Sequence, residues 1–584
     1  MRRLVLTLAP VVLMLFCAPG ASAATGDLTF KDCVARFVAG PCAAVPNQVL
    51  EGGRDVAISP DGKLVFVADM QDSVVGFSRS LADGSVAYAS CLDSSTADDV
   101  GCTHLAANVL LQPRSLAFSP DGASLYVAAE TSDAIVRLTV AAGGGLGFGG
   151  CVEDDALPDW DCATEVASLD GPLRVLVAPD GDVYSVSTEA TLNHFSANLV
   201  QESCYREVTI AGCATQAEPL EAPHGLALSP DGKHLYVTSV GRDAIVWFTR
   251  AAGGALTYAG CIADDDDATA FSDNCAEESG VNYDWLNHIT FGTDANAYVT
   301  DETGLGVVYH FSRDVTTGAL TRQDCLANDI DVDAPGCAEL DDATGSGLAG
   351  VTDAVVSPDA ANLYTVAAQD SALSTFGLAS PGGALTHIRC LRDNAVQGCS
   401  GFGETSVLGG PFGVAISSDG HDLYVANGSG VPALLHFERE APGTRPGEDP
   451  GPDPDPDPGS GGSGGAGSGP GSARPKAPSK VEVKCNGLPA TIVGTSRSEP
   501  LRGTPKRDVI AAGAGDDRVQ SLGGKDVVCG EGGRDQLGGG ADADILLGGP
   551  GKDILKGAGG KDRLLGGPGS DLLLGGPGLD STKQ

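Results

Sequence analysis

The stretch Ser229–Ser239 reads SPDGKHLYVTS and predicts a β-hairpin. Pro, Asp and Gly are the residues that tight turns prefer, and the segment after them alternates aromatic and β-branched residues with other types. A third strand follows in DAIVWFTR, at 243–250. A fourth strand, GALTYAGC at 254–261, follows a glycine turn. The neighbourhood of this stretch is therefore predicted to be a sheet of four short strands.

The same phrase recurs seven times along the chain. Its turn aspartates are 51 to 65 residues apart: Asp61, Asp121, Asp180, Asp231, Asp294, Asp359 and Asp419. Four strands per repeat, seven times over, predict an all-β fold with a seven-bladed β-propeller. The alternative is a pair of stacked β-sandwiches.

The ends of the repeat region favour the propeller. The seventh repeat stops after three strands, at Ala433–Glu440, and a single strand, Gly26–Cys33, precedes the first repeat. That strand can complete the seventh blade and close the ring, which leaves no open sheet edge. Stacked sandwiches give no reason for such a displaced strand.

The motifs SPDGKHLYVTS and SPDGASLYVAA resemble the YVTN repeats and the lactonase-like seven-bladed propellers over about residues 26–441. This resemblance implies the propeller fold. It implies less about activity, because some propellers of this group hydrolyse sugar lactones and others bind ligands or proteins.

The N-terminal segment and the cysteines together indicate an exported protein. Residues 1–23 have a basic start, an apolar stretch and a small-residue cleavage site, which together predict a secretory signal. The sixteen cysteines after it are too widely spaced for common zinc motifs, so we expect disulfides contributing about 2–3 kcal/mol each. The expected pairs are Cys33–Cys42, Cys91–Cys102, Cys151–Cys162, Cys204–Cys213, Cys261–Cys275, Cys325–Cys337, Cys390–Cys399 and Cys485–Cys529. The first seven fall in the inter-blade connections, which we expect to surround one mouth of the channel.

Polar residues near the start of each predicted inner strand are candidates for a site at that mouth. They are Arg54, Arg114, Arg174, His224, His288 and Asp353. A pocket of this kind could gather an anionic or sugar-like ligand, with catalytic candidates His224, His288, Arg114 and Asp353. The alternative is that these side chains only pair with acids in neighbouring loops. The chain has no G-x-S-x-G motif, and its acidic loops lack EF-hand spacing.

The overall charge excludes some partners. The formal net charge is −41, from 77 acidic and 36 basic residues, so the surface repels nucleic acid and anionic membranes. No apolar run after residue 23 is long enough to span a bilayer. We predict a propeller over 24–441, a solvated linker rich in Pro, Asp, Gly and Ser over 442–480, and a further domain over 481–584.

The last domain consists of repeats of nine residues. An example is GGPGKDILK at 548–556, with an aspartate at the sixth position and an aliphatic residue two places later. The units keep strict register for about 90 residues. This pattern resembles the hemolysin-type (RTX) nonapeptide repeat, which implies a calcium-binding parallel β-roll.

Two nonapeptides make one coil of such a roll, so aspartates eighteen residues apart should stack in rows. The expected Ca²⁺ ligands are Asp517, Asp526, Asp535, Asp544, Asp553, Asp562, Asp571 and Asp580. The inward aliphatic residues should be Ile510, Val519, Val528, Leu537, Leu546, Leu555, Leu564 and Leu573. A disordered glycine-rich tail is the alternative, and the unbroken register argues against it.

Together these patterns predict a secreted or surface-associated calcium-binding protein. Its propeller should serve as a recognition or scaffold module for a protein, glycan or small-molecule ligand. The alternative function is a lactonase-like hydrolase that acts on a sugar lactone at the channel mouth.

Overall fold

The computed structural model describes residues 26–440 and 484–583 with short internal gaps, the longest of them residues 265–274. The predicted signal segment and linker lie outside the described residues. The regular elements are strands, and the only helix wholly within the described residues is one 3₁₀ turn, η2 (Val240–Arg242). No described helix has the length and hydropathy needed to cross a bilayer. By internal contacts the chain divides into two units near residue 456.

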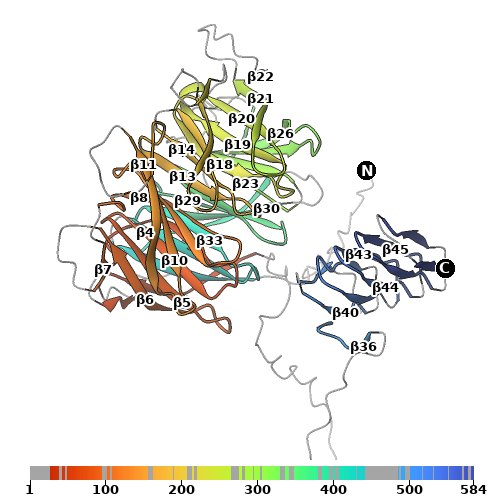
Figure 1. The fold of residues 1–584 in the computed structure, drawn as a ribbon. Helices are drawn as coiled ribbons and strands as arrows, with labels where there is room; N and C mark the ends of the chain where they lie inside the picture. The colour runs from red at the N-terminus through yellow and green to blue at the C-terminus, as the bar shows by residue number, and fades with distance from the viewer. Residues whose placement is uncertain are drawn as a thin grey trace, which may run out of the picture. The chain divides into compact units, whose positions relative to one another are not determined.

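The first unit is the predicted seven-bladed propeller (Figure 1). In each blade four strands pair antiparallel, and a short fifth strand pairs parallel to the outer one. Blades 1 to 3 contain β3 (Gly53–Ile58), β4 (Leu64–Asp69), β5 (Ser73–Arg79), β6 (Val86–Asp93), β7 (Thr103–His104), β8 (Pro113–Phe118), β9 (Ser124–Ala129), β10 (Ala134–Val140), β11 (Leu146–Asp154), β12 (Glu165–Val166), β13 (Pro172–Val177), β14 (Val183–Ser187), β15 (Thr191–Phe195), β16 (Gln201–Arg206) and β17 (Ala214–Thr215).

Blades 4 to 7 repeat this plan. They contain β18 (Pro223–Leu228), β19 (His234–Ser239), β20 (Ala244–Arg250), β21 (Leu256–Asp264), β22 (Ala276–Glu278), β23 (Leu286–Phe291), β24 (Ala297–Asp301), β25 (Val307–Arg313), β26 (Leu320–Ala327), β27 (Ala338–Glu339), β28 (Val351–Val356), β29 (Asn362–Ala367), β30 (Ala372–Leu378), β31 (Leu385–Arg392), β32 (Ser400–Gly401), β33 (Pro411–Ile416), β34 (Asp422–Asn427) and β35 (Ala433–Arg439).

The N-terminal strand closes the ring, as predicted. Strand β1 (Leu28–Ala35) pairs antiparallel with β35, from Leu28 opposite Arg439 to Ala35 opposite Ala433, and β2 (Ala43–Ala44) follows it. The rings of Phe30 and Phe437 meet edge to face at 5.6 Å. The seventh blade therefore combines strands from the two ends of the propeller.

Tyrosines on the second strands of five blades, Tyr126, Tyr184, Tyr236, Tyr364 and Tyr424, donate to backbone carbonyls of the next blade. The hydroxyl of Tyr236 donates to the carbonyl of Gly318 at 2.6 Å, and Arg313 Nε donates to the same hydroxyl at 3.1 Å. At the ring closure Tyr364 donates in the same way to Gly26, at 2.9 Å. Buried aliphatic and aromatic residues of facing sheets fill the space between blades. Apolar packing thus holds neighbouring blades together, and at five blade boundaries a recurring polar contact adds to it.

The disulfides lie at the outer edges of the blades. Cys91, on β6, bonds to Cys102, which directly precedes β7. The other blades repeat this arrangement, except that Cys162 lies three residues before β12. Neighbouring strands of a blade run in opposite directions, so the end of the fourth strand lies on the same face of the propeller as the start of the first strand. The disulfides therefore lie on that face. The disulfides themselves lie on the outer strands of the blades. The loops that they close, which we expected to surround the channel mouth, lie largely outside the described residues. The disulfide returns the chain alongside the fourth strand, which explains the fifth strand that the sequence did not predict.

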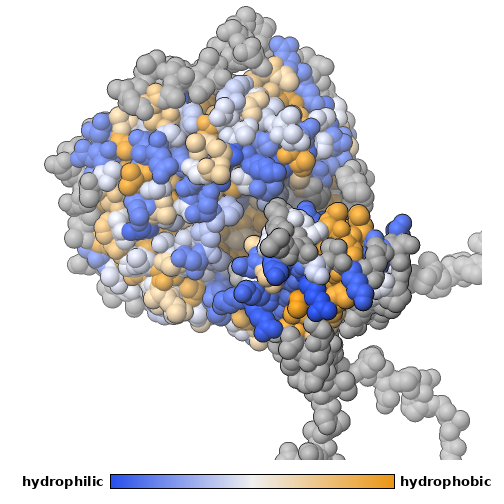
Figure 2. Space-filling model, turned by 45° about the vertical axis from the view of Figure 1, so that its right-hand side comes forward, coloured by the Kyte–Doolittle hydropathy of each residue, from blue (hydrophilic) through white to orange (hydrophobic). Residues whose placement is uncertain are grey.

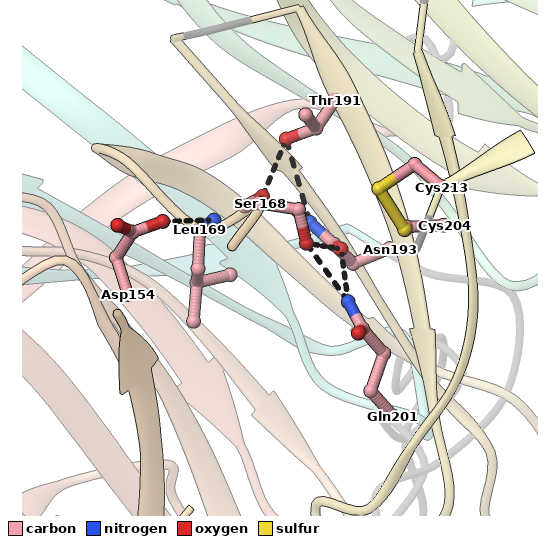
Figure 3. The surroundings of a disulfide bond; sticks show 8 residues. All are labelled: Asp154, Ser168, Leu169, Thr191, Asn193, Gln201, Cys204 and Cys213. Carbon is pink, nitrogen blue, oxygen red and sulfur yellow. Dashed lines mark hydrogen bonds between the residues drawn. A yellow bond between two sulfur atoms is a disulfide. The ribbon is translucent and has the colours of Figure 1, made fainter. Parts of the chain in front are cut away.

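Buried polar side chains fix the connection into the third blade (Figure 3). Ser168, in this connection, donates from Oγ to Asn193 Oδ1 at 2.7 Å, and Gln201 Nε2 donates to Ser168 Oγ at 2.8 Å. The Cys204–Cys213 disulfide lies beside this network. The connection is therefore bonded to the third and fourth strands of its own blade.

The second unit is the predicted parallel β-roll. A hairpin of β36 (Lys484–Cys485) and β37 (Leu488–Pro489) precedes two parallel sheets whose paired residues are eighteen apart in sequence. One sheet holds β38 (Ile492–Val493), β40 (Val509–Ala511), β42 (Val527–Cys529), β44 (Ile545–Leu547), β46 (Arg563–Leu565) and β48 (Ser581–Lys583). The other holds β39 (Pro500–Arg502), β41 (Arg518–Gln520), β43 (Gln536–Gly540), β45 (Ile554–Ala558) and β47 (Leu572–Leu574).

A single line of aliphatic residues forms the core between the two sheets. It contains the predicted inward residues from Ile510 to Leu564, with Leu573 partly buried against them. The Cys485–Cys529 disulfide joins the hairpin to the roll. Outward positions are mixed, and Ile554, Leu572 and Leu574 are exposed. Hydrophobic and hydrophilic residues are likewise interspersed on the surface in Figure 2.

Candidate functional site

The aspartates of the roll form two stacked rows. In one row, the amide of Asp526 donates to Asp544 Oδ1 and the amide of Asp544 donates to Asp562 Oδ1, both at 2.9 Å. In the other row, the amide of Asp535 donates to Asp553 Oδ1 at 2.9 Å. Each carboxylate is thereby oriented by the coil before it. Asp580, predicted as a ligand, lies outside the described residues.

The second oxygen of these carboxylates faces the glycine turn. Asp544 and Asp553 are each only 1 % exposed, and their Oδ2 atoms have no hydrogen-bond partner among the described residues. A Cβ placed on Gly548 would meet both Asp553 Oδ2 and the carbonyl oxygen of Gly566 at 2.5 Å. Glycine is therefore required here, because any side chain would fill the space that these two oxygens approach.

Burial and mutual repulsion make the rows electrostatically unfavourable. Burial, followed by the charges of Asp526 and Asp562, raises the pKa of Asp544 to about 7. Burial and the neighbouring Asp571 also raise the pKa of Asp553. Carboxylates at strand spacing, about 4.8 Å, repel by about 3 kcal/mol at an effective dielectric of about 20. A cation between the coils would reverse this repulsion.

The donor set fits a hard cation. Among the described residues no three His, Cys, Asp or Glu side chains come together as a metal-binding group. The roll instead offers buried carboxylate oxygens together with glycine carbonyls, and oxygen atoms of these kinds are what calcium binds. Asp508, at the weaker start of the repeats, is different because Thr504 donates to its Oδ2 from both backbone and side chain.

The propeller channel is lined by the first strand of every blade. The pairing of first and second strands shifts register near the second residue in all seven blades, as between Gly53 and Asp55. Bulges of this kind re-aim side chains. The six polar residues predicted for the mouth occupy the second or third position of their strands, and all of them line the channel.

The larger chamber of the channel has a volume of about 490 Å³ and is lined by Arg174, His288 and Asp353 together with Asp55. Burial and mutual repulsion raise the pKa of Asp55 to about 6, and burial raises that of Asp353 to about 6. Asp353 Oδ2 accepts from the amide of Val414, on the next blade, at 2.8 Å. Asp55 makes the equivalent contact, so both carboxylates hold neighbouring blades together.

His288 is largely buried and lies close to Asp353. Its Nδ1 lies 3.1 Å from Asp353 Oδ1, yet Nδ1 has no hydrogen-bond partner among the described residues. Burial, aided by the nearby Arg174, lowers the pKa of His288 to about 3. The imidazole is therefore neutral and weakly basic at physiological pH.

The smaller chamber, of about 110 Å³, contains the other predicted residues. Arg54, Arg114 and His224 line it, and Arg174 lines both chambers. The four catalytic candidates are thus divided, with Arg114 and His224 in the smaller chamber and His288 and Asp353 in the larger one.

Sequence reasoning missed several residues of the channel. Asp55 occupies the position in its blade that Asp353 occupies in the sixth blade, so alignment of the repeats could have identified it. Asn287 directly precedes a predicted residue. Glu302, which lines the smaller chamber, and Glu130, which pairs with Arg114, both follow second strands, and no pattern in the sequence marks either of them.

Comparison with known families gives the nature of the second unit. The family model described as the RTX calcium-binding nonapeptide repeat (4 copies) matches residues 502–537 and residues 538–580. The C-terminal segment therefore carries calcium-binding RTX repeats. None of the curated proteins matches the chain.

Several solved structures are similar to this chain at low identity and low TM-score. The periplasmic gluconolactonase PpgL of Pseudomonas aeruginosa is 13 % identical, covers 63 % of this chain and 95 % of its own, and has a TM-score of 0.42. Virginiamycin B lyase of Staphylococcus aureus is 14 % identical, covers 66 % and 95 %, and has a TM-score of 0.39. Kuenenia stuttgartiensis hydrazine synthase is 15 % identical, covers 66 % and 96 %, and has a TM-score of 0.40. The activities named belong to those proteins.

Proposed function

We propose that this is a secreted calcium-binding protein whose roll holds Ca²⁺ between successive coils and whose propeller recognises a ligand. One observation carries the calcium part of the proposal. Asp544 and Asp553, one in each row, keep a buried carboxylate oxygen that has no hydrogen-bond partner among the described residues. Burial of an unsatisfied charge is costly, so these oxygens are suited to a cation.

The proposed ligands come from both sides of each glycine turn. Calcium takes six to eight oxygen ligands, which one aspartate pair cannot supply. Carbonyl oxygens such as those of Gly557 and Gly566 approach the same turns and can complete the set. The proposed aspartate ligands are Asp517, Asp526, Asp535, Asp544, Asp553, Asp562, Asp571 and Asp580. Bound calcium would neutralise the two rows.

Calcium should also drive folding of the roll. Each nonapeptide buries one aliphatic side chain, which contributes about 1.5–3 kcal/mol. Ordering nine residues costs about 1–2 kcal/mol per residue for the backbone alone. The core cannot offset this cost while the aspartate rows repel, so ion binding and folding should be coupled. Export into a calcium-rich medium would then fold the roll after translocation.

The channel supports a recognition role for the propeller. The ring is closed, and the channel along its axis has two chambers lined by charged side chains. Ligand sites in proteins are commonly concave pockets with a few polar groups that converge on the ligand. The neutral His288 and the blade-linking contacts of Asp55 and Asp353 favour binding or support over acid–base catalysis. The net charge of −41 is compatible with cations or neutral partners on the outer surface.

The test is a calcium titration of the full chain, followed by far-ultraviolet circular dichroism and by calorimetric melting. Calcium should add β-structure and a melting transition, and magnesium should do so far less because it prefers rigid octahedral sites. The double variant Asp544→Asn/Asp553→Asn should raise the calcium midpoint at least tenfold.

Asp542→Asn is the matched control, because Asp542 is exposed and lies two residues before Asp544 in the same turn. It should leave the calcium midpoint nearly unchanged. A roll that is equally folded with and without calcium would contradict the proposal, as would equal effects of the control and the double variant.

A further inference from the structure

Three guanidinium groups line the smaller chamber of the propeller channel. They belong to Arg54, Arg114 and Arg174, and among the described residues the only carboxylate in the lining is that of Glu302. Like charges that share a small cavity repel each other, and a cavity of this kind favours a negatively charged occupant.

One of the three arginines is already committed to a partner. Arg114 Nη2 donates to Glu130 Oε1 at 2.8 Å, and Arg114 Nε donates to Glu130 Oε2. Bidentate pairs of this kind are strong and geometrically rigid. Arg114 is therefore a fixed part of the wall. Arg54 and Arg174 interact with the described carboxylates of the channel only through charge, Arg54 with Glu130 and Arg174 with Asp55 and Asp353.

Arg54 and Arg174 lack such partners. Arg54 Nε is buried and has no hydrogen-bond partner in the part of the chain that the structure describes. Burial and then the charge of Arg114 lower the pKa of Arg54. Arg174 makes no hydrogen bond or ion pair with any described residue, and it stands between the two chambers.

The remaining wall is polar and largely neutral. His224 Nδ1 lies 3.1 Å from Asn287 Oδ1, and because an amide oxygen only accepts, this nitrogen carries the proton. Burial, together with Arg174 and Arg114, lowers the pKa of His224, so the ring is neutral. Glu302 is itself poorly placed for a charge, since burial raises its pKa.

We propose that the smaller chamber binds an oxyanion group, a carboxylate or a phosphate ester carried by a small ligand, between Arg54 and Arg174. This inference deepens the recognition role proposed for the propeller and rests on it. The chamber of about 110 Å³ has the volume of three to four waters at about 30 Å³ each, which suits one such group. Planar guanidinium donors match both oxyanions in geometry.

Titration calorimetry of the full chain tests the proposal, with acetate and inorganic phosphate as separate probes in calcium-free buffer of constant ionic strength. The wild type should bind one anion per chain, and the tighter of the two probes indicates which oxyanion the ligand carries. Arg54→Gln should weaken binding at least tenfold. Glu302→Gln should tighten binding several-fold, because it removes the only carboxylate of the lining.

Arg518→Gln, an exposed position on the roll, is the matched control and should change nothing. Absence of binding at about 10 mM anion, or equal affinity in the wild type and Arg54→Gln, would overturn the proposal. Glu302→Gln keeps the test decisive if Arg54→Gln fails to fold. The calcium response of the same preparation does not involve these arginines, so its persistence would show that only the anion site has failed.

Discussion

Replacement of Leu28 by alanine should loosen the ring at a single seam. Leu28 begins β1, is 2 % exposed and lies opposite Arg439. The matched control is Leu256→Ala, because Leu256 is 5 % exposed, begins the fourth strand of blade 4 and lies opposite Arg250 in the same register. The two changes remove the same atoms from equivalent environments.

The two variants should nevertheless differ in how they open. Loss of a buried leucine side chain to alanine costs about 2–5 kcal/mol. No covalent bond joins β1 to β35, and the pairing of Lys31 with Glu438 spans 407 residues. Strand β1 can therefore detach alone, whereas β21 follows β20 directly in the chain. If the free energy of detaching β1 falls by about 3 kcal/mol, the equilibrium constant for its detachment rises roughly a hundredfold, because 1.4 kcal/mol corresponds to a factor of ten.

Hydrogen exchange followed by mass spectrometry measures this opening directly. Leu28→Ala should speed amide exchange about a hundredfold in β1 and β35 and leave the other blades unchanged. Leu256→Ala should lower the melting temperature of the whole propeller with little selective exchange in β20 and β21. Uniform faster exchange in both variants would refute the idea that the closing strand opens independently.

Two further predictions concern the histidines. Burial would lower the pKa of His436, but hydrogen bonds to Asp32 and Asp422 outweigh burial and raise it. The stability that protonated His436 contributes to the fold should therefore be fully present below about pH 6.5 and be lost as the pH rises through its folded-state pKa. The difference in melting temperature between the wild type and His436→Gln should consequently shrink from pH 6 to pH 9. We also expect no hydrolysis across a panel of sugar lactones, because His288, with a pKa of about 3, is a weak base. A clear wild-type rate that His288→Ala abolishes would contradict this.

Repetition made most of the fold predictable from the sequence. Seven copies of one turn and strand pattern indicated the blades, and the unpaired strand before Cys33 indicated how the ring closes. In the roll, a period of nine placed Ile510 and its equivalents inside. The fifth strands were not predicted, because segments of two or three residues such as Thr103–His104 carry no hydrophobic periodicity.

The channel site was predicted less completely, because the side chains that contact each other there come from different strands and loops. Arg54 and Arg114 could be identified from their positions before apolar strands. Glu130 could not, since its pairing with Arg114 depends on the return of β9 beside β8. In the roll, the repeat pattern identified the aspartates. It did not show that backbone amides of the preceding coil bind Oδ1 of Asp544 and Asp553 and leave Oδ2 without a hydrogen-bond partner among the described residues, because these contacts exist only in the coiled backbone.

The position of the disulfides affects how the protein can mature. Each of the seven propeller disulfides closes within one blade, between cysteines 9 to 14 residues apart. The disulfide of a blade can therefore form once its own two cysteines are accessible to an oxidant, without waiting for the other blades. None of the seven crosses a boundary between blades, so an oxidised propeller retains the same freedom to open its ring as a reduced one.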